Sequence, residues 1–299
     1  MGFKSGFVGV LGRANVGKST FINTLLGKKL LVVSHKRQST RNRIRCILNE
    51  EDAQIVFVDT PGLHKPVDKL SKYLLKQAYG ALAGLDLVVY MVEPWVEIGE
   101  YDQKIFDQIA KLNKTALLLI NKIDTAKSNE VPETIKNYAA TRLFAEIVPI
   151  SCKLGMNLGT TLDLIKKYLP EGPKYFPDEM QIDRPEDFVI AEFIREKVYN
   201  LTIQEVPYSV AVEVFEMRER TVGARLASPL EIYANIYVAR ESQKGILIGE
   251  GGRMIKEIGT QARTEIEKWL NNRVYLDLRV KVKEKWNEDE AQIAKMLGR

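Results

Sequence analysis

The sequence predicts an α/β domain with a mostly parallel sheet, followed by a smaller α+β domain. In the first half, short β-rich runs such as GFVGVLG, AQIVFVD and TALLLIN alternate with amphipathic helical stretches, which is typical of βαβ units. Near residue 170 the pattern changes, because LPEGPKYFPDEMQIDRPEDF places four prolines in a short span. We therefore expect a first domain at residues 1–172, a linker at 173–184 and a second domain at 185–299.

The second domain is predicted from three patterns. The run EDFVIAEFIREKVYN is helical, and the segments LEIYANIYVAR and VYLDLRVKVK alternate apolar and polar residues, which indicates half-buried strands. Between these strands, MIKEIGTQARTEIEKWL repeats apolar residues at helical spacing. The stripe consists of Ile255, Ile258, Ala262, Ile266 and Trp269.

Composition indicates a globular chain, since 45% of the 299 residues are hydrophobic and the formal net charge is +5. The positive charge is clustered in residues 36–45 and 240–285. Cys46 and Cys152 lie too far apart in sequence for a zinc or redox motif. We therefore expect the protein to reside in the reducing cytosol. The longest apolar runs, such as LDLVVYMV, are too short to span a bilayer, and we expect no transmembrane segment.

The stretch GRANVGKS matches the phosphate-binding pattern G-x-x-x-x-G-K-[ST], after an apolar strand and before an amphipathic helix. In such a loop the backbone N–H groups meet phosphate oxygens, the lysine reaches the β and γ phosphates, and the serine ligates Mg²⁺. The predicted nucleotide-binding residues of this loop are Gly12, Arg13, Ala14, Asn15, Val16, Gly17, Lys18, Ser19 and Thr20.

The base is indicated by Asn121-Lys122-Ile123-Asp124, after the strand TALLLI. A carboxylate at Asp124 offers two acceptors to the N1–H and N2–H₂ donors of guanine, whereas adenine would leave it unpaired. Alone, this stretch could be a surface turn, but at this distance after a phosphate loop it favours guanine. Backbone contacts from the loop after EIVPI would complete the base pocket, and its residues are Ser151, Cys152 and Lys153.

A third stretch, Asp59-Thr60-Pro61-Gly62, ends the strand QIVFV. Asp59 can hold Mg²⁺ through water, and the Gly62 N–H can meet the γ-phosphate; the alternative is a strand followed by a simple Pro-Gly turn. Thr40, within the basic run, is the candidate that closes on Mg²⁺ when the γ-phosphate is present. The adjacent Ser39 could be mistaken for this ligand. The predicted metal ligands are Ser19, Thr40 and Asp59.

A second glycine-rich stretch, GILIGEGGRMIKEIG, lacks G-K-[ST] and so cannot be a second nucleotide loop. It fits the G-x-x-G of a KH domain, where a nucleic-acid backbone approaches the glycines and the following helix N-terminus meets phosphate. Apolar side chains would pack under bases and cations would face the backbone, although each cation could instead be a solvated helix charge. The predicted RNA-binding residues are Ile248, Gly249, Glu250, Gly251, Gly252, Arg253, Lys256 and Arg263.

These motifs, in this order, resemble those of translation-factor-like GTPases, and of the bacterial Era family in particular, over nearly all 299 residues. The resemblance implies a P-loop GTPase domain followed by a type II KH domain, with Mg²⁺ as cofactor and GTP hydrolysed to GDP. It also implies binding of the single-stranded 3′ end of small-subunit ribosomal RNA during assembly of that subunit. The implied location is the cytoplasm, in part as a peripheral protein at the inner face of the membrane.

Several residues bear on the details of this resemblance. Leu63 stands where many GTPases place the glutamine that orients the attacking water, so we expect slow intrinsic hydrolysis. Asn15 resembles the asparagine that related GTPases use to ligate K⁺ beside the phosphates; the alternative is a simple turn-former. Ala14 replaces the usual proline, and Glu250 puts an acid where KH loops often carry a base. The predicted catalytic residues are Asn15, Lys18, Thr40 and Gly62, and the nucleotide-contacting set includes Leu63.

Two other classes of protein stay open. One is a P-loop kinase or ATPase, against which the sequence NKID argues. The other is a GTPase whose C-terminal domain binds a protein or a membrane surface, a role in which G-x-x-G has no use.

Overall fold

The computed structural model describes residues 2–34, 36, 40–62, 68–80, 82, 84–95, 97–203, 205–219 and 230–297. Contacts divide the chain into two compact units. The first unit extends to Asp183, and the second begins at Arg184 and also includes the described residues of Val32–Ser39 and Asp68–Tyr73. Leu63 and Ser39, both considered above, lie outside the described residues.

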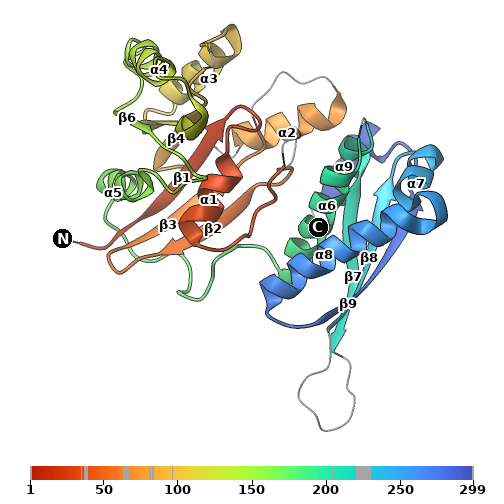
Figure 1. Cartoon of the computed structure of the whole chain (residues 1–299). Coiled ribbons are helices and arrows are strands. Elements are labelled where there is room, and N and C mark those ends of the chain that lie inside the picture. The colour runs from red at the N-terminus through yellow and green to blue at the C-terminus, as the bar shows by residue number, and fades with distance from the viewer. Residues whose placement is uncertain are drawn as a thin grey trace. The chain divides into compact units, whose positions relative to one another are not determined.

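The first unit is built on a six-stranded sheet in the order β2-β3-β1-β4-β5-β6, shown in red to green in Figure 1. All neighbouring strands are parallel except β2, which runs antiparallel to β3. The prediction of a mostly parallel sheet is therefore confirmed, whereas β2 had not been recognised beside the basic run. The strands are β1 (Lys4–Gly12), β2 (Ile44–Asn49), β3 (Ala53–Asp59), β4 (Leu87–Val92), β5 (Thr115–Ile120) and β6 (Glu146–Pro149).

A helix follows each of these strands except β2, which leads directly into β3, and the first residues of α2 cluster with the second unit. Every residue of β3 and β4 is buried, as expected when helices cover both faces of a parallel sheet. Because parallel strands end at one edge of a sheet, the loops that follow β1, β3, β5 and β6 lie at the same edge. The helices are α1 (Lys18–Leu26), α2 (Lys69–Gly80), α3 (Glu100–Lys111), α4 (Glu130–Ala139) and α5 (Leu158–Tyr168).

The second unit is a small α+β fold, as predicted. Its sheet has the order β7-β8-β9, with β8 antiparallel to β7 and parallel to β9, and α6 packs beside α8 against it (Figure 1). The sequence patterns did not identify α7 or α9. The elements are α6 (Glu186–Leu201), β7 (Ala211–Glu219), β8 (Leu230–Val238), α7 (Glu241–Ile248), α8 (Arg253–Leu270), β9 (Val274–Val282) and α9 (Glu290–Leu297).

The apolar stripe of α8 serves two purposes. Ile258, Ala262 and Ile266 are fully buried in the core of the unit, and Trp269 packs edge-on against Phe193 with ring centroids 5.9 Å apart. Ile255, at the start of the same stripe, stays only partly buried. The N-terminal end of α8 is therefore less covered by the core than the rest of the helix.

The proline-rich segment is hydrogen-bonded to the first unit. The carbonyl of Pro173 accepts from Ser5 Oγ at 2.7 Å, the carbonyl of Phe176 accepts from Gln54 Nε2 at 2.8 Å, and the Ile47 N–H donates to Gln181 O at 2.9 Å. The segment thus follows the sheet of the first unit up to Asp183. The domain boundaries stated above stay a prediction.

Replacement of Ile258 by alanine should destabilise the second unit. Its side chain has no exposed area, and removing a buried isoleucine to alanine costs about 2–5 kcal/mol through lost burial and a residual cavity. Urea unfolding should show a lower midpoint for Ile258→Ala. The exposed neighbour variant Glu257→Ala should unfold like the wild type, and equal shifts in both variants would contradict the assignment of this helix face.

Candidate functional site

The phosphate loop is shaped by two glycines. A Cβ on Gly12, which has φ 145°, would lie 2.4 Å from the carbonyl oxygen of Met91. A Cβ on Gly17, with φ 102°, would lie 2.3 Å from Asn121 Nδ2. Neither contact is tolerable, so neighbouring loops require glycine at both positions. Gly17 precedes α1 without a side-chain cap, and the first turn of α1 carries no acid, so its N-terminus suits an anion.

Lys18 lies buried within this loop. Its Nζ donates to the carbonyls of Gly12 at 3.2 Å and Arg13 at 2.9 Å. Burial lowers the pKa of Lys18 to about 8, although the charge of Asp59 acts in the opposite direction. A phosphate beside the ammonium would stabilise its charged form, which fits the predicted role of Lys18.

The three predicted metal ligands lie together at the edge of the sheet. Ser19 Oγ donates to Asp59 Oδ2 at 3.1 Å, Thr40 Oγ1 donates to the same oxygen at 3.0 Å, and the two hydroxyls are 3.2 Å apart. Asp59 is fully buried, and this burial raises its pKa against the opposing effects of Lys18 and the two hydroxyls. Its Oδ1 is buried without a hydrogen-bond partner among the described residues. Two hydroxyls and a buried carboxylate are suitable oxygen ligands for Mg²⁺.

The loop after β3 lies against the phosphate loop. A Cβ on Gly62 would lie 3.1 Å from Ala14 Cα, and Thr60 Oγ1 donates to Val10 O at 3.2 Å. The backbone of Gly62 is therefore beside the phosphate loop, where its predicted contact with a γ-phosphate requires it.

The predicted base pocket brings together three segments that are distant in sequence. Asn121 Nδ2 donates to Val16 O at 2.8 Å, and Asn121 Oδ1 accepts from the Cys152 N–H at 3.1 Å. Ser151 Oγ donates to Asp124 Oδ1 at 2.6 Å. The structure thus places the phosphate loop, NKID and the Ser151–Lys153 loop around one site, with the Asp124 carboxylate oriented by a hydroxyl.

The second glycine loop lies between α7 and α8. A Cβ on Gly249, which has φ 70°, would lie 2.9 Å from the backbone nitrogen of Met254, whereas Cβ atoms on Gly251 and Gly252 would meet nothing within 4 Å. The loop is therefore closed against the protein on one side and open on the other, where a ligand backbone can approach. Gly252 precedes α8, whose first turn carries no acid.

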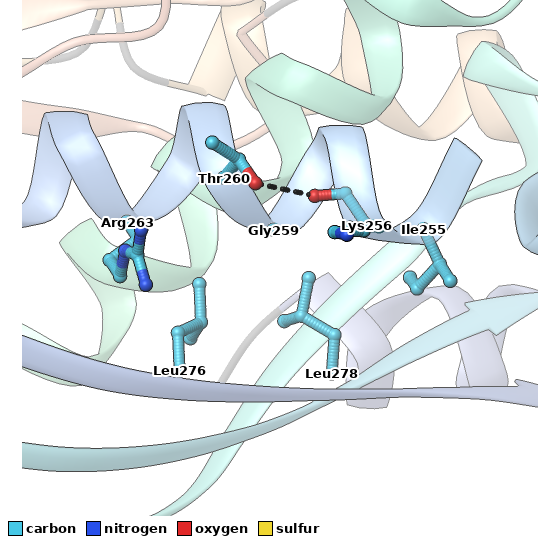
Figure 2. Close-up of a pocket in the computed structure, with 7 residues that line it drawn as sticks. All are labelled: Ile255, Lys256, Gly259, Thr260, Arg263, Leu276 and Leu278. Carbon is cyan, nitrogen blue, oxygen red and sulfur yellow. Dashed lines mark hydrogen bonds between the residues drawn. The ribbon is translucent and has the colours of Figure 1, made fainter. Parts of the chain in front are cut away.

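A groove of about 390 Å³ runs between α8 and β9. Figure 2 shows Leu276 and Leu278 rising from β9 toward the helix, with Lys256 and Arg263 above them. An apolar floor with cations above it suits stacked bases and their phosphates. The alternation in VYLDLRVKVK puts these leucines on the apolar face of their strand. It gave no indication of the groove, because the groove depends on the spacing of α8 and β9. The lining residues are Ile255, Lys256, Gly259, Thr260, Arg263, Leu276 and Leu278.

The remaining predicted RNA-binding residues lie around the glycine loop. Ile248, at the end of α7, is 37% exposed. Arg253 Nη2 pairs with Glu250 Oε2 at 2.7 Å, and both side chains are largely exposed. Exposed ion pairs are weak, so Arg253 can exchange Glu250 for a phosphate. In the part of the chain that the structure describes, no helix is both long enough and apolar enough to cross a membrane.

Comparison with known proteins matches both units. Residues 7–122 match the family model of the 50S ribosome-binding GTPase, and residues 205–287 match that of the KH domain. The chain is 48% identical over 297 residues to the GTPase Era of Clostridium tetani, covering 99% of each chain. It is 47% identical over 294 residues to the GTPase Era of Geobacter metallireducens, covering 98% of this chain and 97% of the relative.

Two solved structures are similar over 99% of both chains, each with a TM-score of 0.92 and 38% identity. One is Era in complex with MgGDPNP and nucleotides 1506–1542 of 16S ribosomal RNA. The other is a variant of Aquifex aeolicus Era bound to GDP·AlF4⁻.

Fold and site together define a P-loop GTPase with a C-terminal KH domain, an enzyme that hydrolyses GTP. The chain belongs to the Era family of GTPases. This membership excludes the kinase and ATPase alternatives, and the C-terminal unit matches the KH family, whose G-x-x-G loop binds single-stranded nucleic acid.

Asp124→Asn should change the nucleotide preference from guanosine to xanthosine. An amide presents a donor where guanine also presents one, and losing two charge-assisted hydrogen bonds should weaken GDP binding by roughly 100-fold or more. Titrations with GDP and XDP would measure this. Unchanged GDP affinity in a folded Asp124→Asn protein would show that the base is recognised elsewhere.

Proposed function

We propose that this protein is a GTP-controlled switch that binds the single-stranded 3′ end of small-subunit ribosomal RNA during assembly of that subunit. The observation that carries the proposal is the groove between α8 and β9, open beside a G-x-x-G loop in a chain that also holds a guanine-nucleotide site. A relative 38% identical over nearly the whole chain is solved with this region of RNA and a GTP analogue.

For GTP hydrolysis, the proposed roles follow the geometry of the phosphate loop. Lys18 leaves the carbonyls of Gly12 and Arg13 to meet the β and γ phosphates. Ser19, Thr40 and Asp59 hold Mg²⁺, which supplies positive charge to the phosphates when bound. The Gly62 N–H, beside the same loop, donates to the γ-phosphate and stabilises charge that develops there.

Asn15 is proposed to ligate K⁺ beside the phosphates. It is exposed in the phosphate loop and has φ 68°, a left-handed conformation that asparagine tolerates better than most residues. The same conformation suits a simple turn-former, so the geometry supports both roles, and only the response to K⁺ separates them.

For RNA, the proposed mode uses both sides of the groove. Bases lie over Leu276 and Leu278, while Lys256 and Arg263 meet phosphates, and the backbone passes the open side of Gly251. KH domains hold about four unpaired nucleotides in this way. Binding through phosphate contacts should weaken steeply as salt rises.

The proposed organisation places the GTPase domain at residues 1–172 and the RNA-binding domain at 185–299, joined through 173–184. The proposed location is the cytoplasm, with a fraction of the molecules associated peripherally with the inner face of the membrane. The family resemblance supports the location.

Single-turnover GTP cleavage should be faster in KCl than in NaCl if Asn15 ligates K⁺. The ion supplies charge that arginine fingers give elsewhere, an effect of about tenfold or more. Asn15→Ala should remove the difference between the salts. Leu63→Gln should not restore a fast rate by itself, and equal wild-type rates in both salts would contradict the K⁺ role.

Gly251→Asp combined with Gly252→Asp should abolish RNA binding and leave GDP affinity unchanged. Both glycines have positive φ with open space around them, and aspartate tolerates this conformation, so the variant should fold. Two negative charges would repel the RNA backbone. Titration with a single-stranded oligonucleotide of the ribosomal 3′ end would measure the loss.

The matched control is Gly251→Asn with Gly252→Asn, which imposes similar backbone strain without charge. It should retain more RNA affinity than the aspartate variant. A folded aspartate variant that binds RNA like the wild type would contradict the RNA site, and one that loses GDP instead would contradict the division of the chain.

A further inference from the structure

The guanidinium of Arg13, at the second position of the phosphate loop, is held by α3. Its Nε donates to Asp102 Oδ1 at 3.1 Å, and its Nη2 pairs with Asp102 Oδ2 and donates to Glu97 O at 3.3 Å. The side chain of Arg13 is 38% exposed, whereas that of Asp102 is 1% exposed. A loop residue is thus fixed to a buried carboxylate that is distant from it in sequence.

Asp102 is itself held in place by two further contacts. It lies in the first turn of α3, where its Oδ2 accepts from the Gly99 N–H at 2.8 Å. Its Oδ1 accepts from the hydroxyl of Tyr90, a buried residue of β4, at 2.9 Å. Burial and the adjacent carboxylate raise the pKa of Tyr90, so the hydroxyl keeps its proton and donates a hydrogen bond to Asp102. The carboxylate is therefore a rigid anchor.

The anchored residue is the one that holds Lys18. The carbonyls of Gly12 and Arg13 accept from Lys18 Nζ, and Gly12 packs against the carbonyl of Met91 at the end of β4. Two contacts thus fix the start of the phosphate loop. The backbone of β4 packs against Gly12, and Asp102 holds the side chain of Arg13. A site that is already in its binding geometry loses less conformational entropy when ligand enters.

The guanine-recognition loop has a corresponding contact. Lys122, which has φ 66°, lies between Asn121 and Asp124, and its Nζ pairs with the carboxylate of Glu93. Glu93 directly follows β4 and is 17% exposed. The segment from the end of β4 to the first turn of α3 therefore supplies one acid to the phosphate loop and a second acid to the base loop.

We propose that Asp102 and Glu93 are positioning residues that hold the two loops of the nucleotide site through Arg13 and Lys122. The proposal rests on the proposed nucleotide site and adds to it two residues, one directly after β4 and one in the first turn of α3. Both act through another side chain, and their effect is to keep the two loops in the geometry that binds nucleotide. Their loss should therefore appear mainly as faster release of nucleotide.

The experiment measures the dissociation rate of a fluorescent GDP analogue from the full-length protein with Mg²⁺. Arg13→Gln and Asp102→Asn should each increase the rate by about tenfold, the value of one charge-assisted hydrogen bond. The double variant should release GDP no faster than either single variant, because both remove the same interaction. Glu93→Gln should also increase the rate, and its effect should multiply with that of Asp102→Asn.

A matched control is Asp52→Asn, which removes the contact of Asp52 with Lys166 Nζ at 2.7 Å. Asp52 directly precedes β3 and lies at the opposite edge of the sheet from the phosphate loop, so GDP release should be unchanged. Thermal unfolding without nucleotide, measured for every variant, separates general destabilisation from loosening of the site. If Asp102→Asn does not fold, the GDP release rate of Arg13→Gln tests the proposal by itself. The side chain of Arg13 is partly exposed, so this variant should fold.

Wild-type rates of GDP release in folded Arg13→Gln and Asp102→Asn would overturn the proposal. Independent, multiplying effects of those two substitutions would also overturn it. Failure of the wild type to bind GDP would instead contradict the nucleotide site itself.

Discussion

The side-chain amide of Asn121 is the contact on which the nucleotide site depends. It donates to the phosphate loop at Val16 O and accepts from the Cys152 N–H, so one planar group fixes the distance between three loops. Asn121 is 3% exposed, and an amide left unpaired there would cost its full desolvation. The position of the Asn121 amide also requires glycine at position 17, because any Cβ there would displace Asn121.

The chain has two glycine loops, for which we propose two different ligands, and the surroundings of the glycines differ between them. At Gly12 and Gly17 a side chain would collide with the protein, so the loop is enclosed and fits a compact phosphate group. At Gly251 and Gly252 a side chain would meet open space, so the backbone is available to a long polymer that enters and leaves the site. Both loops precede a helix N-terminus, which supplies the same attraction for phosphate in each case.

Two buried charges of the first unit, Lys18 and Asp59, lie at the proposed nucleotide site. Lys18 and Asp59 are buried, and burial shifts their pKa values toward the neutral forms. Burying such charges is costly, and nucleotide phosphates and Mg²⁺ would supply them with partners of opposite charge. Asp102 is equally buried but is already paired with Arg13, Tyr90 and Gly99. It therefore belongs to the scaffold rather than to the ligand-dependent part of the site.

The sequence by itself determined the sheet-and-helix alternation, the nucleotide motifs and the KH loop, because each depends on residues close together in the chain. It identified Ser19, Thr40 and Asp59 as partners only through a known pattern, and their separations of 3.0–3.2 Å required the fold. Tertiary structure alone decided the Arg13–Asp102 pair, which joins residues 89 positions apart, and the groove, which depends on the spacing of α8 and β9. Local periodicity shows which face of an element is apolar, but it contains no information on which distant element will pack against that face.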